Sequence, residues 1–305
     1  MKNHLFLATL CSVVLLSCSS GGGSTDPDIP NPPQPDKPPV EKLPINISTS
    51  ITRATETAFE NGDQIGLFVV NRNADGTPDA LKPSGNYVDN MLFTYNSTWT
   101  PATSVYWKDN NTKADFYLYY PYRKTVTSVS AMPFDINANQ SAVAAYKAAD
   151  LLIGSTLNVA PTKSAVSIVA KHVMSQVEIV LKAGAGFTES SLAASKVAVS
   201  LNGLKTSATV DIASAAVTAK GSATTITPYK DGTAYRAIVI PQKVSQTNLI
   251  TVNVDGRDFN LPKAFTFTGG KRHTFTVTLE KTSSGVNVTI GAWEDDGTDN
   301  GGTAS

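Results

Sequence analysis

Hydrophobic and polar residues alternate with a period of two through most of the chain between Ile45 and Trp293. Because successive side chains of a strand point to opposite faces of a sheet, this alternation predicts half-buried β-strands. Asp255 and Gly256 separate two alternating runs and predict a two-residue hairpin. The predicted strands cover residues 45–52, 64–70, 115–120, 177–181, 197–201, 236–240, 249–254, 257–261, 275–279 and 286–290.

Helical patterns are rare. Only residues 142–152, which are rich in Ala, and residues 187–195 predict short helices. Many short strands between polar turns are typical of β-sandwiches and not of a parallel α/β sheet. We therefore predict an all-β chain with two domains, residues 45–185 and 186–293, and a boundary near Ala185. Residues 294–305 are acidic and rich in Gly, and predict a disordered tail.

The first seventeen residues predict a bacterial lipoprotein signal peptide. Lys2 supplies the positive start, and residues 5–16 form an apolar run that is too short for a stable transmembrane helix. The run ends in Leu15-Leu16-Ser17-Cys18, which is typical of a lipobox, with Cys18 as the lipidated first residue of the mature protein. The alternative is an ordinary signal peptide with a chance cysteine, and the small Ser and Gly residues that follow favour lipidation.

A tether, residues 18–44, follows the signal peptide. Its first part is rich in Gly and Ser, and residues 26–44 contain eight of the 17 prolines. Such a segment favours polyproline II, at about 3.1 Å per residue, and the proline-rich part would reach roughly 60 Å. The sequence therefore predicts a folded part held clear of a membrane.

Composition excludes several classes of function. The formal net charge is zero, and no basic stripe indicates a nucleic-acid partner. Both cysteines, Cys11 and Cys18, lie in the first twenty residues, so the predicted domains have no thiolate chemistry or disulfide. His172 and His273 are far apart in sequence, and we expect each to be structural. No nucleophile elbow, phosphate loop or zinc-protease motif is present, which predicts a protein that is not an enzyme and needs no cofactor or metal.

Two further features have a structural and a functional interpretation. For the aromatic run at residues 117–122, the functional interpretation is a platform that stacks on a sugar, but the core of a sheet explains the run better. The acidic residues 294–299 lack the oxygen spacing of a calcium loop, and a solvated tail explains them better.

Residues 45–52 form a self-contained alternating strand with Ile45, Ile47 and Ile51 on one face. Arg53 and Ala54 follow at once. An arginine after a strand is usually only solvated, but here an Arg-specific protease would separate the strand from the rest of its domain.

In their order along the chain, the motifs resemble the fimbrillin family of Bacteroidetes, lipoproteins that build type V pili. The resemblance covers almost the whole mature chain, although each motif alone is unspecific. The matching segments are Thr52-Arg53-Ala54-Thr55, residues 59–68, Val105-Tyr106-Trp107, residues 115–122, Asp150-Leu151-Leu152, residues 172–179, residues 237–242, residues 267–271 and Ala292-Trp293.

The resemblance implies two tandem transthyretin-like β-sandwich domains and a structural function in adhesion, as a stalk, tip or anchor subunit of a pilus. It implies an outer-membrane lipoprotein whose N-terminal strand is removed by an Arg-specific protease, with Arg53 and Ala54 at the cut. A strand of a neighbouring subunit then fills the vacant groove by β-strand complementation. Removal of Ile45, Ile47 and Ile51 would open that groove, and Val286, Val288 and Ile290 offer a comparable face for donation.

Some alternatives stay open at this point. The polar residues after Trp293 leave undecided whether the last strand is donated or belongs to its own domain. A surface glycan-binding lipoprotein of a nutrient-uptake system would share the lipobox, the tether and the β-sandwiches. The sequence does not identify a host or bacterial receptor.

Overall fold

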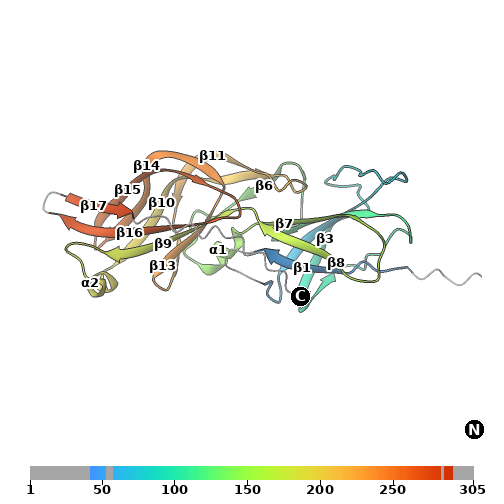
Figure 1. The fold of residues 1–305 in the computed structure, drawn as a ribbon, viewed down its shortest axis with the longest axis horizontal. Coiled ribbons are helices and arrows are strands. Elements are labelled where there is room, and N and C mark those ends of the chain that lie inside the picture. The colour runs from blue at the N-terminus through green and yellow to red at the C-terminus, as the bar shows by residue number, and fades with distance from the viewer. Residues whose placement is uncertain (1–41, 53–57, 283–284, 291–305) are drawn as a thin grey trace, which may run out of the picture. The chain divides into compact units, whose positions relative to one another are not determined.

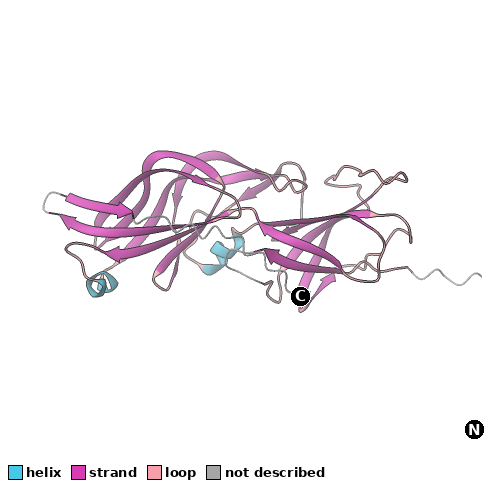
Figure 2. Ribbon diagram, in the orientation of Figure 1, coloured by secondary structure: helices cyan, strands magenta, loops and turns pink. Residues whose placement is uncertain are grey.

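A computed structural model describes residues 42–52, 58–282 and 285–290, with the backbone alone for 285–290. The described residues form seventeen strands and two short helices, so the predicted all-β class is confirmed (Figure 2). The strands are β1 (Ile47–Thr52), β2 (Gln64–Asn71), β3 (Val88–Asn96), β4 (Thr98–Pro101), β5 (Ala114–Tyr120), β6 (Met132–Asp135), β7 (Leu152–Val159), β8 (Val166–His172), β9 (Ser175–Ala183), β10 (Val197–Val210), β11 (Val217–Ile226), β12 (Tyr229–Asp231), β13 (Ala234–Val239), β14 (Gln242–Val254), β15 (Arg257–Phe267), β16 (Arg272–Thr282) and β17 (Gly285–Ile290); the helices are α1 (Val143–Ala148) and α2 (Glu189–Ala194).

The first sheet has seven strands in the order β1-β8-β7-β5-β2-β3-β4. Its outermost strands are β1, the first along the chain, and β4. Strand β1 runs parallel to β8, whereas the other neighbours in this sheet are antiparallel. The chain therefore contributes its first strand to an edge of a sheet that is otherwise built from later residues (Figure 1).

Two five-stranded sheets contain the later strands. One has the order β11-β10-β14-β15, with β6 also paired to β10, and the other has the order β12-β13-β9-β16-β17. Apart from β6, which lies earlier in the chain, the change from the first sheet to these two occurs between β8 and β9, about ten residues before the predicted boundary at Ala185. The described residues form one compact unit by their contacts, and the two predicted domains stay a prediction.

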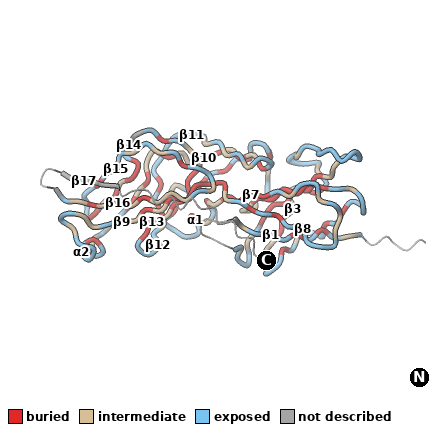
Figure 3. The backbone as a smooth tube through the Cα atoms, in the orientation of Figure 1, coloured by how far each residue is buried: buried red, intermediate tan, exposed pale blue. Residues whose placement is uncertain are grey.

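Two clusters of buried residues fill the structure. Strands β2 and β5 contribute to both, because their alternate side chains enter opposite clusters: Leu67 and Phe116 lie in one, Phe68 and Tyr117 in the other. Strands buried on both faces read as continuous apolar runs, which explains the unbroken hydrophobic stretches of these two strands. In Figure 3 the buried residues follow the strands, and exposure is concentrated in the connecting loops.

The predicted hairpin at Asp255 and Gly256 is confirmed, since both residues have positive φ, 50° and 85°, as a type I′ turn requires. The predicted helix at residues 142–152 is too long. It ends at Ala148, and Leu152 already starts β7. The second helix begins with a capping box between Thr188 and Ser191.

Gly66 marks a close approach between β2 and β5. A Cβ atom at this position would lie 2.2 Å from Cε1 of Tyr119 and 2.7 Å from Oδ1 of Asn90. The Tyr119 ring is fully buried, and its hydroxyl donates to Asn90 at 2.8 Å and accepts from the amide of Arg123 at 3.1 Å. Burial raises the pKa of the Tyr119 phenol to about 12. The ring cannot move aside without losing these bonds, so only glycine fits at position 66.

Candidate strand-exchange site

The segment 43–52, which includes β1, lies at the edge of the first sheet, as the sequence predicts. Ile45 and Ile47 are buried, at 3% and 6% exposure, and Ile51 is only partly buried. The polar residues between them, Asn46 and Ser48, are exposed. β-Branched side chains restrict the backbone to extended conformations and pack well on one face of a sheet, which explains why this sequence forms a strand here.

Segment 43–52 is paired in two steps. First, the Ile45 amide donates to the Val105 carbonyl at 2.9 Å, and the Trp107 amide donates to the Leu43 carbonyl at 2.8 Å. The chain then turns to β8, where the Val166 amide donates to the carbonyl of Asn46 at 2.8 Å. Backbone hydrogen bonds therefore hold the start of the segment to residues 105–107 and its continuation to β8.

Along β1 the parallel register with β8 places Ile47 beside Val166, Thr49 beside Ile168 and Ile51 beside Ala170. All three β8 residues are buried, and they belong to the same cluster as Ile45 and Ile47. The apolar face of β1 therefore extends the row of apolar side chains that β8 contributes to this cluster.

A side-chain hydrogen bond joins the two outermost strands of the first sheet. The indole Nε1 of Trp99, in β4, donates to Oγ1 of Thr49, in β1, at 2.8 Å. Since β1 and β4 are opposite ends of the strand order, the sheet curls until its two edges meet at this bond. Strand β1 closes the curled sheet.

An aromatic cluster surrounds this closure. The ring of Phe59 lies 4.9 Å from that of Trp99 and 5.6 Å from that of Tyr120, both edge-on, and Tyr95 lies 5.1 Å from Trp99. Edge-to-face pairs of this kind are favourable by about 0.5–1.5 kcal/mol beyond the area that they bury. Phe59 therefore packs against the same tryptophan that β1 contacts.

The residues after Phe59 are bound to the domain independently of β1. The Gly62 amide donates to the carbonyl of Tyr95 at 2.8 Å, and the Lys147 ammonium lies 2.9 Å from the carboxylate of Glu60. Tyr120 donates to Asp63 at 3.1 Å. Nothing in these contacts involves segment 43–52, so the two sides of residues 53–57 have separate attachments.

The remaining predicted site residues lie mostly outside the described residues. Cys18, Arg53 and Ala54 are among these. Strand β17 pairs antiparallel with β16 at the edge of its sheet, with Val288 beside Leu279 and Ile290 beside Val277. In this structure the last strand is therefore a resident strand of its own chain. The side chains of Val286, Val288 and Ile290 are outside the described part.

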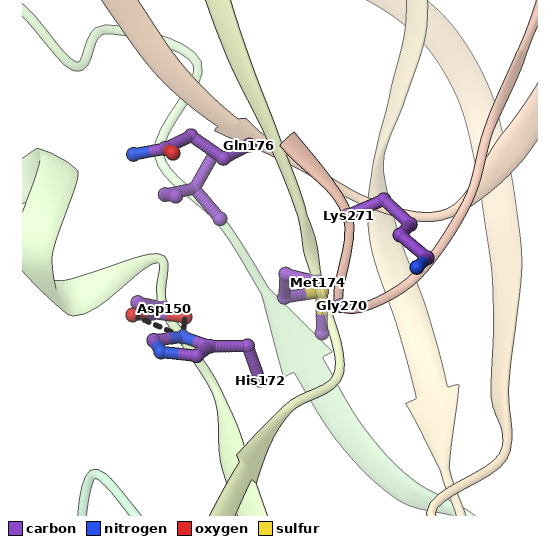
Figure 4. A pocket seen from close by; sticks show the side chains of 7 residues that line it. Asp150, His172, Met174, Gln176, Gly270 and Lys271 are labelled. Atoms are coloured by element: carbon purple, nitrogen blue, oxygen red, sulfur yellow. Dashed lines mark hydrogen bonds and ion pairs between the residues drawn. The ribbon is translucent and has the colours of Figure 1, made fainter. Parts of the chain in front are cut away.

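His172 has a partner that the sequence did not indicate. Its Nδ1 lies 2.9 Å from the Asp150 carboxylate, and its Nε2 is buried without a hydrogen bond among the described residues. Figure 4 shows the imidazole and carboxylate facing each other beside a cavity of about 10 Å³, which is close to the size of one water molecule, while the Lys271 side chain points away. The pair joins β8 to the end of α1, and no nucleophile adjoins it among the residues that line the cavity.

Other expectations about chemistry are tested in part. His273 accepts a hydrogen bond from the Thr268 amide at 3.1 Å. In the run 117–122, Tyr117, Leu118 and Tyr119 are buried and the other two tyrosines are partly buried, so the run belongs to the sheet core and is not an exposed platform. Within the described ranges, no group of three or more His, Cys, Asp and Glu residues is arranged to hold a metal ion. None of the helices described is long and apolar enough to cross a membrane.

Comparison with known proteins gives a consistent result. The chain is 26% identical over 308 residues to a Bacteroides uniformis protein named "Putative fimbrium subunit Fim1C", covering 96% of this chain and 95% of the relative. The crystal structure of a "putative cell adhesion protein" from Bacteroides uniformis ATCC 8492 has a TM-score of 0.64 to this chain at 22% identity. The match covers 85% of this chain and 99% of that one.

A fimbrial protein of Bacteroides ovatus has a TM-score of 0.53 at 23% identity, over 79% of this chain and 51% of that one. At these identities the solved structures support the fold alone. The sequence profile described as fimbrillin-like matches residues 52–293, which is most of the chain and includes every strand from β2 to β17. The chain therefore belongs to the fimbrillin-like family.

Proposed function

We propose that this protein is a structural, non-enzymatic subunit of a surface fimbrium that supports adhesion and joins its neighbours by strand exchange at β1. The observation that carries the proposal is the position of β1. It is an edge strand, close to the N-terminus, whose apolar face closes a curled sheet. Family membership supports the fimbrial part of the proposal.

Release of β1 would leave a long template for another strand. Val166, Ile168 and Ala170 would lose the β1 residues that lie beside them, and the backbone edge of β8 would lose its partners. A strand edge with unpaired amides and carbonyls beside an apolar surface readily adds an extended segment. The resident strand should not leave on its own, because burying Ile45 and Ile47 is worth about 1.5–3 kcal/mol for each side chain.

A cut between Arg53 and Ala54 changes this balance. While the chain is intact, the short link at residues 53–57 keeps β1 at a high effective concentration beside β8. After the cut that high effective concentration is lost, and a donor strand held nearby by a docked subunit competes more effectively for the edge of β8. Phe59 and Glu60 have their own attachments, so the new N-terminus would stay bound while β1 departs.

The proposed life cycle begins at the outer membrane. Cys18 carries the lipid, and the proline-rich tether, residues 18–44, spaces the folded part from the surface. We assign the first sheet and the two five-stranded sheets to two tandem transthyretin-like sandwiches, with the boundary between β8 and β9 in place of the predicted boundary at Ala185. Val286, Val288 and Ile290 of one subunit are candidate donor residues for the groove of another, because they repeat the β-branched alternation of Ile45 and Ile47.

The test is N-terminal sequencing of this protein from sheared fimbriae. We expect it to begin at Ala54. Arg53→Lys keeps the positive charge but removes the Arg-specific site, and should leave a membrane-bound monomer that begins at Cys18. Thr55→Ala, in the same link, is the matched control and should assemble normally. Assembled wild-type protein that still begins at Cys18 would refute exchange of β1 in this subunit.

A second candidate function, glycan binding at the surface, is favoured by one observation. Tyr87 and Tyr106 are 41% and 38% exposed and line a cleft of about 300 Å³ together with Lys42 and Lys108. Exposed aromatic rings beside polar groups suit the faces of sugars. The test compares glycan binding by fimbriated cells that carry the wild-type protein or the double variant Tyr87→Ala, Tyr106→Ala. Loss of binding in the double variant, with fimbrial assembly unchanged, would support this function.

A further inference from the structure

Trp99 presents one polar atom to the strand that closes the sheet. The residue is 9% exposed, and its indole Nε1 donates to Oγ1 of Thr49. Phe59 and Tyr95 pack against the ring at 4.9 Å and 5.1 Å and fix its orientation. Because the residue is 9% exposed and packed between these rings, its indole N–H would have little access to water if its acceptor were removed.

The acceptor belongs to the strand that strand exchange would replace. Thr49 lies on the inward face of β1, between Ile47 and Ile51, whereas its neighbours Ser48 and Ser50 are exposed. An incoming strand that places an aliphatic side chain at this position would fill the space but leave the indole N–H unpaired. A buried unpaired donor is costly, while valine and threonine are otherwise nearly the same shape.

We propose that Trp99 selects the donor strand, by requiring a hydroxyl at the position that Thr49 occupies. This inference rests on the proposed exchange of β1. The favoured donor has an alternating pattern of the form apolar-x-apolar-x-Thr/Ser-x-apolar, and it runs parallel to β8 as β1 does.

The last strand of this chain does not fit that pattern. By alternation of the sequence, its apolar positions are Val286, Val288 and Ile290, and its one hydroxyl, on Thr289, belongs to the alternate set. In any register that places one of these three residues opposite Trp99, the strand offers no hydroxyl acceptor to the indole. The preferred donor is therefore a strand of a different subunit, and a second copy of this chain is disfavoured.

The experiment uses the full chain with a site-specific protease sequence in place of residues 53–57. After cutting, fluorescent peptides compete for the place of segment 43–52. The peptides are the wild-type segment, the same segment with Thr49→Ser, and the same segment with Thr49→Val. A fourth peptide carries residues 285–293, which leaves out Ser284, and three derivatives of it carry Val286→Thr, Val288→Thr or Ile290→Thr. The matched protein variant is Trp99→Phe, which keeps a ring but has no N–H.

The expected result is selection by the hydroxyl. Thr and Ser peptides should bind the cut protein within a few fold of each other, and the Val peptide about tenfold more weakly, as the loss of one buried hydrogen bond implies. One of the three threonine derivatives of the last strand should gain about tenfold. On the Trp99→Phe protein, these differences should disappear.

Failures of the two proposals look different. If no peptide, including the wild-type segment, replaces the resident strand, strand exchange at β1 is wrong. If peptides exchange but Thr and Val bind equally, exchange stands and selection by Trp99 is wrong. A Trp99→Phe protein that does not fold leaves the comparison of Thr, Ser and Val peptides on the wild-type protein, which decides the question by itself.

Discussion

Substitution of Ile47 by alanine tests whether side-chain burial holds β1 in place. Ile47 is 6% exposed and lies beside Val166 in the register of the two strands. Truncating a buried isoleucine to alanine costs about 2–5 kcal/mol. An edge strand relaxes more readily than a central one, so we expect the lower part of this range, about 2–3 kcal/mol, for the free energy of detaching β1.

Amide hydrogen exchange measures this free energy directly. The amide of Val166 is protected by its bond to the carbonyl of Asn46, and it exchanges when β1 detaches. With about 1.4 kcal/mol for each factor of ten, Ile47→Ala should accelerate the exchange of Val166 by roughly 30- to 150-fold. The amide of Ile238, which donates to the Gln140 side chain at 2.9 Å in a different sheet, is the internal reference and should change much less.

Ser48→Ala is the matched control, since Ser48 lies on the exposed face of the same strand. It should leave the exchange of Val166 within about threefold of the wild type. Two results would refute the reasoning. Equal rates for Ile47→Ala and Ser48→Ala would mean that burial does not hold the strand. Equal acceleration at Val166 and Ile238 would mean that β1 detaches only when the whole protein unfolds.

Three other predictions concern stability and anchoring. Gly66→Ala should lower the free energy of unfolding by about 2–3 kcal/mol or more in urea titrations, because the new Cβ would overlap the fixed Tyr119 ring. The raised pKa of Tyr119 means that the folded state holds its proton more tightly than the unfolded state. Its contribution to the free energy of unfolding is complete below pH 10 and is lost as the pH rises to about 12. Tyr119→Phe should remove this loss of stability at alkaline pH. Cys18→Ala should move the protein out of the membrane fraction or block its processing, and acyl labelling of the wild type checks the premise; unchanged fractionation without label would contradict it.

The local pattern of the sequence predicted ten of the seventeen described strands, and it predicted the hairpin. Period-two alternation identified β1, β9, β10 and β16, and the pair Asp255-Gly256 identified the turn between β14 and β15. These features follow from the backbone preferences of neighbouring residues, which do not depend on the rest of the fold. Strand β8 carried the same signal in Val166, Ile168 and Ala170, and an analysis of alternation alone would have found it. Strand β11 gave little signal, because most of its side chains are small and exposed.

The sequence also identified the burial of Ile45 and Ile47, but it could not show what they cover. The parallel pairing of β1 with β8 joins residues more than a hundred positions apart, and no local preference specifies such a partner. For the same reason Thr49 read as one of three polar residues in a row. Only the curling of the first sheet, which brings β4 back to β1, places the indole of Trp99 where it donates a hydrogen bond to the Thr49 hydroxyl. The sequence by itself determined that the fold begins with a strand that has one apolar face, and the tertiary structure decided that this strand lies at a sheet edge and which groups it meets.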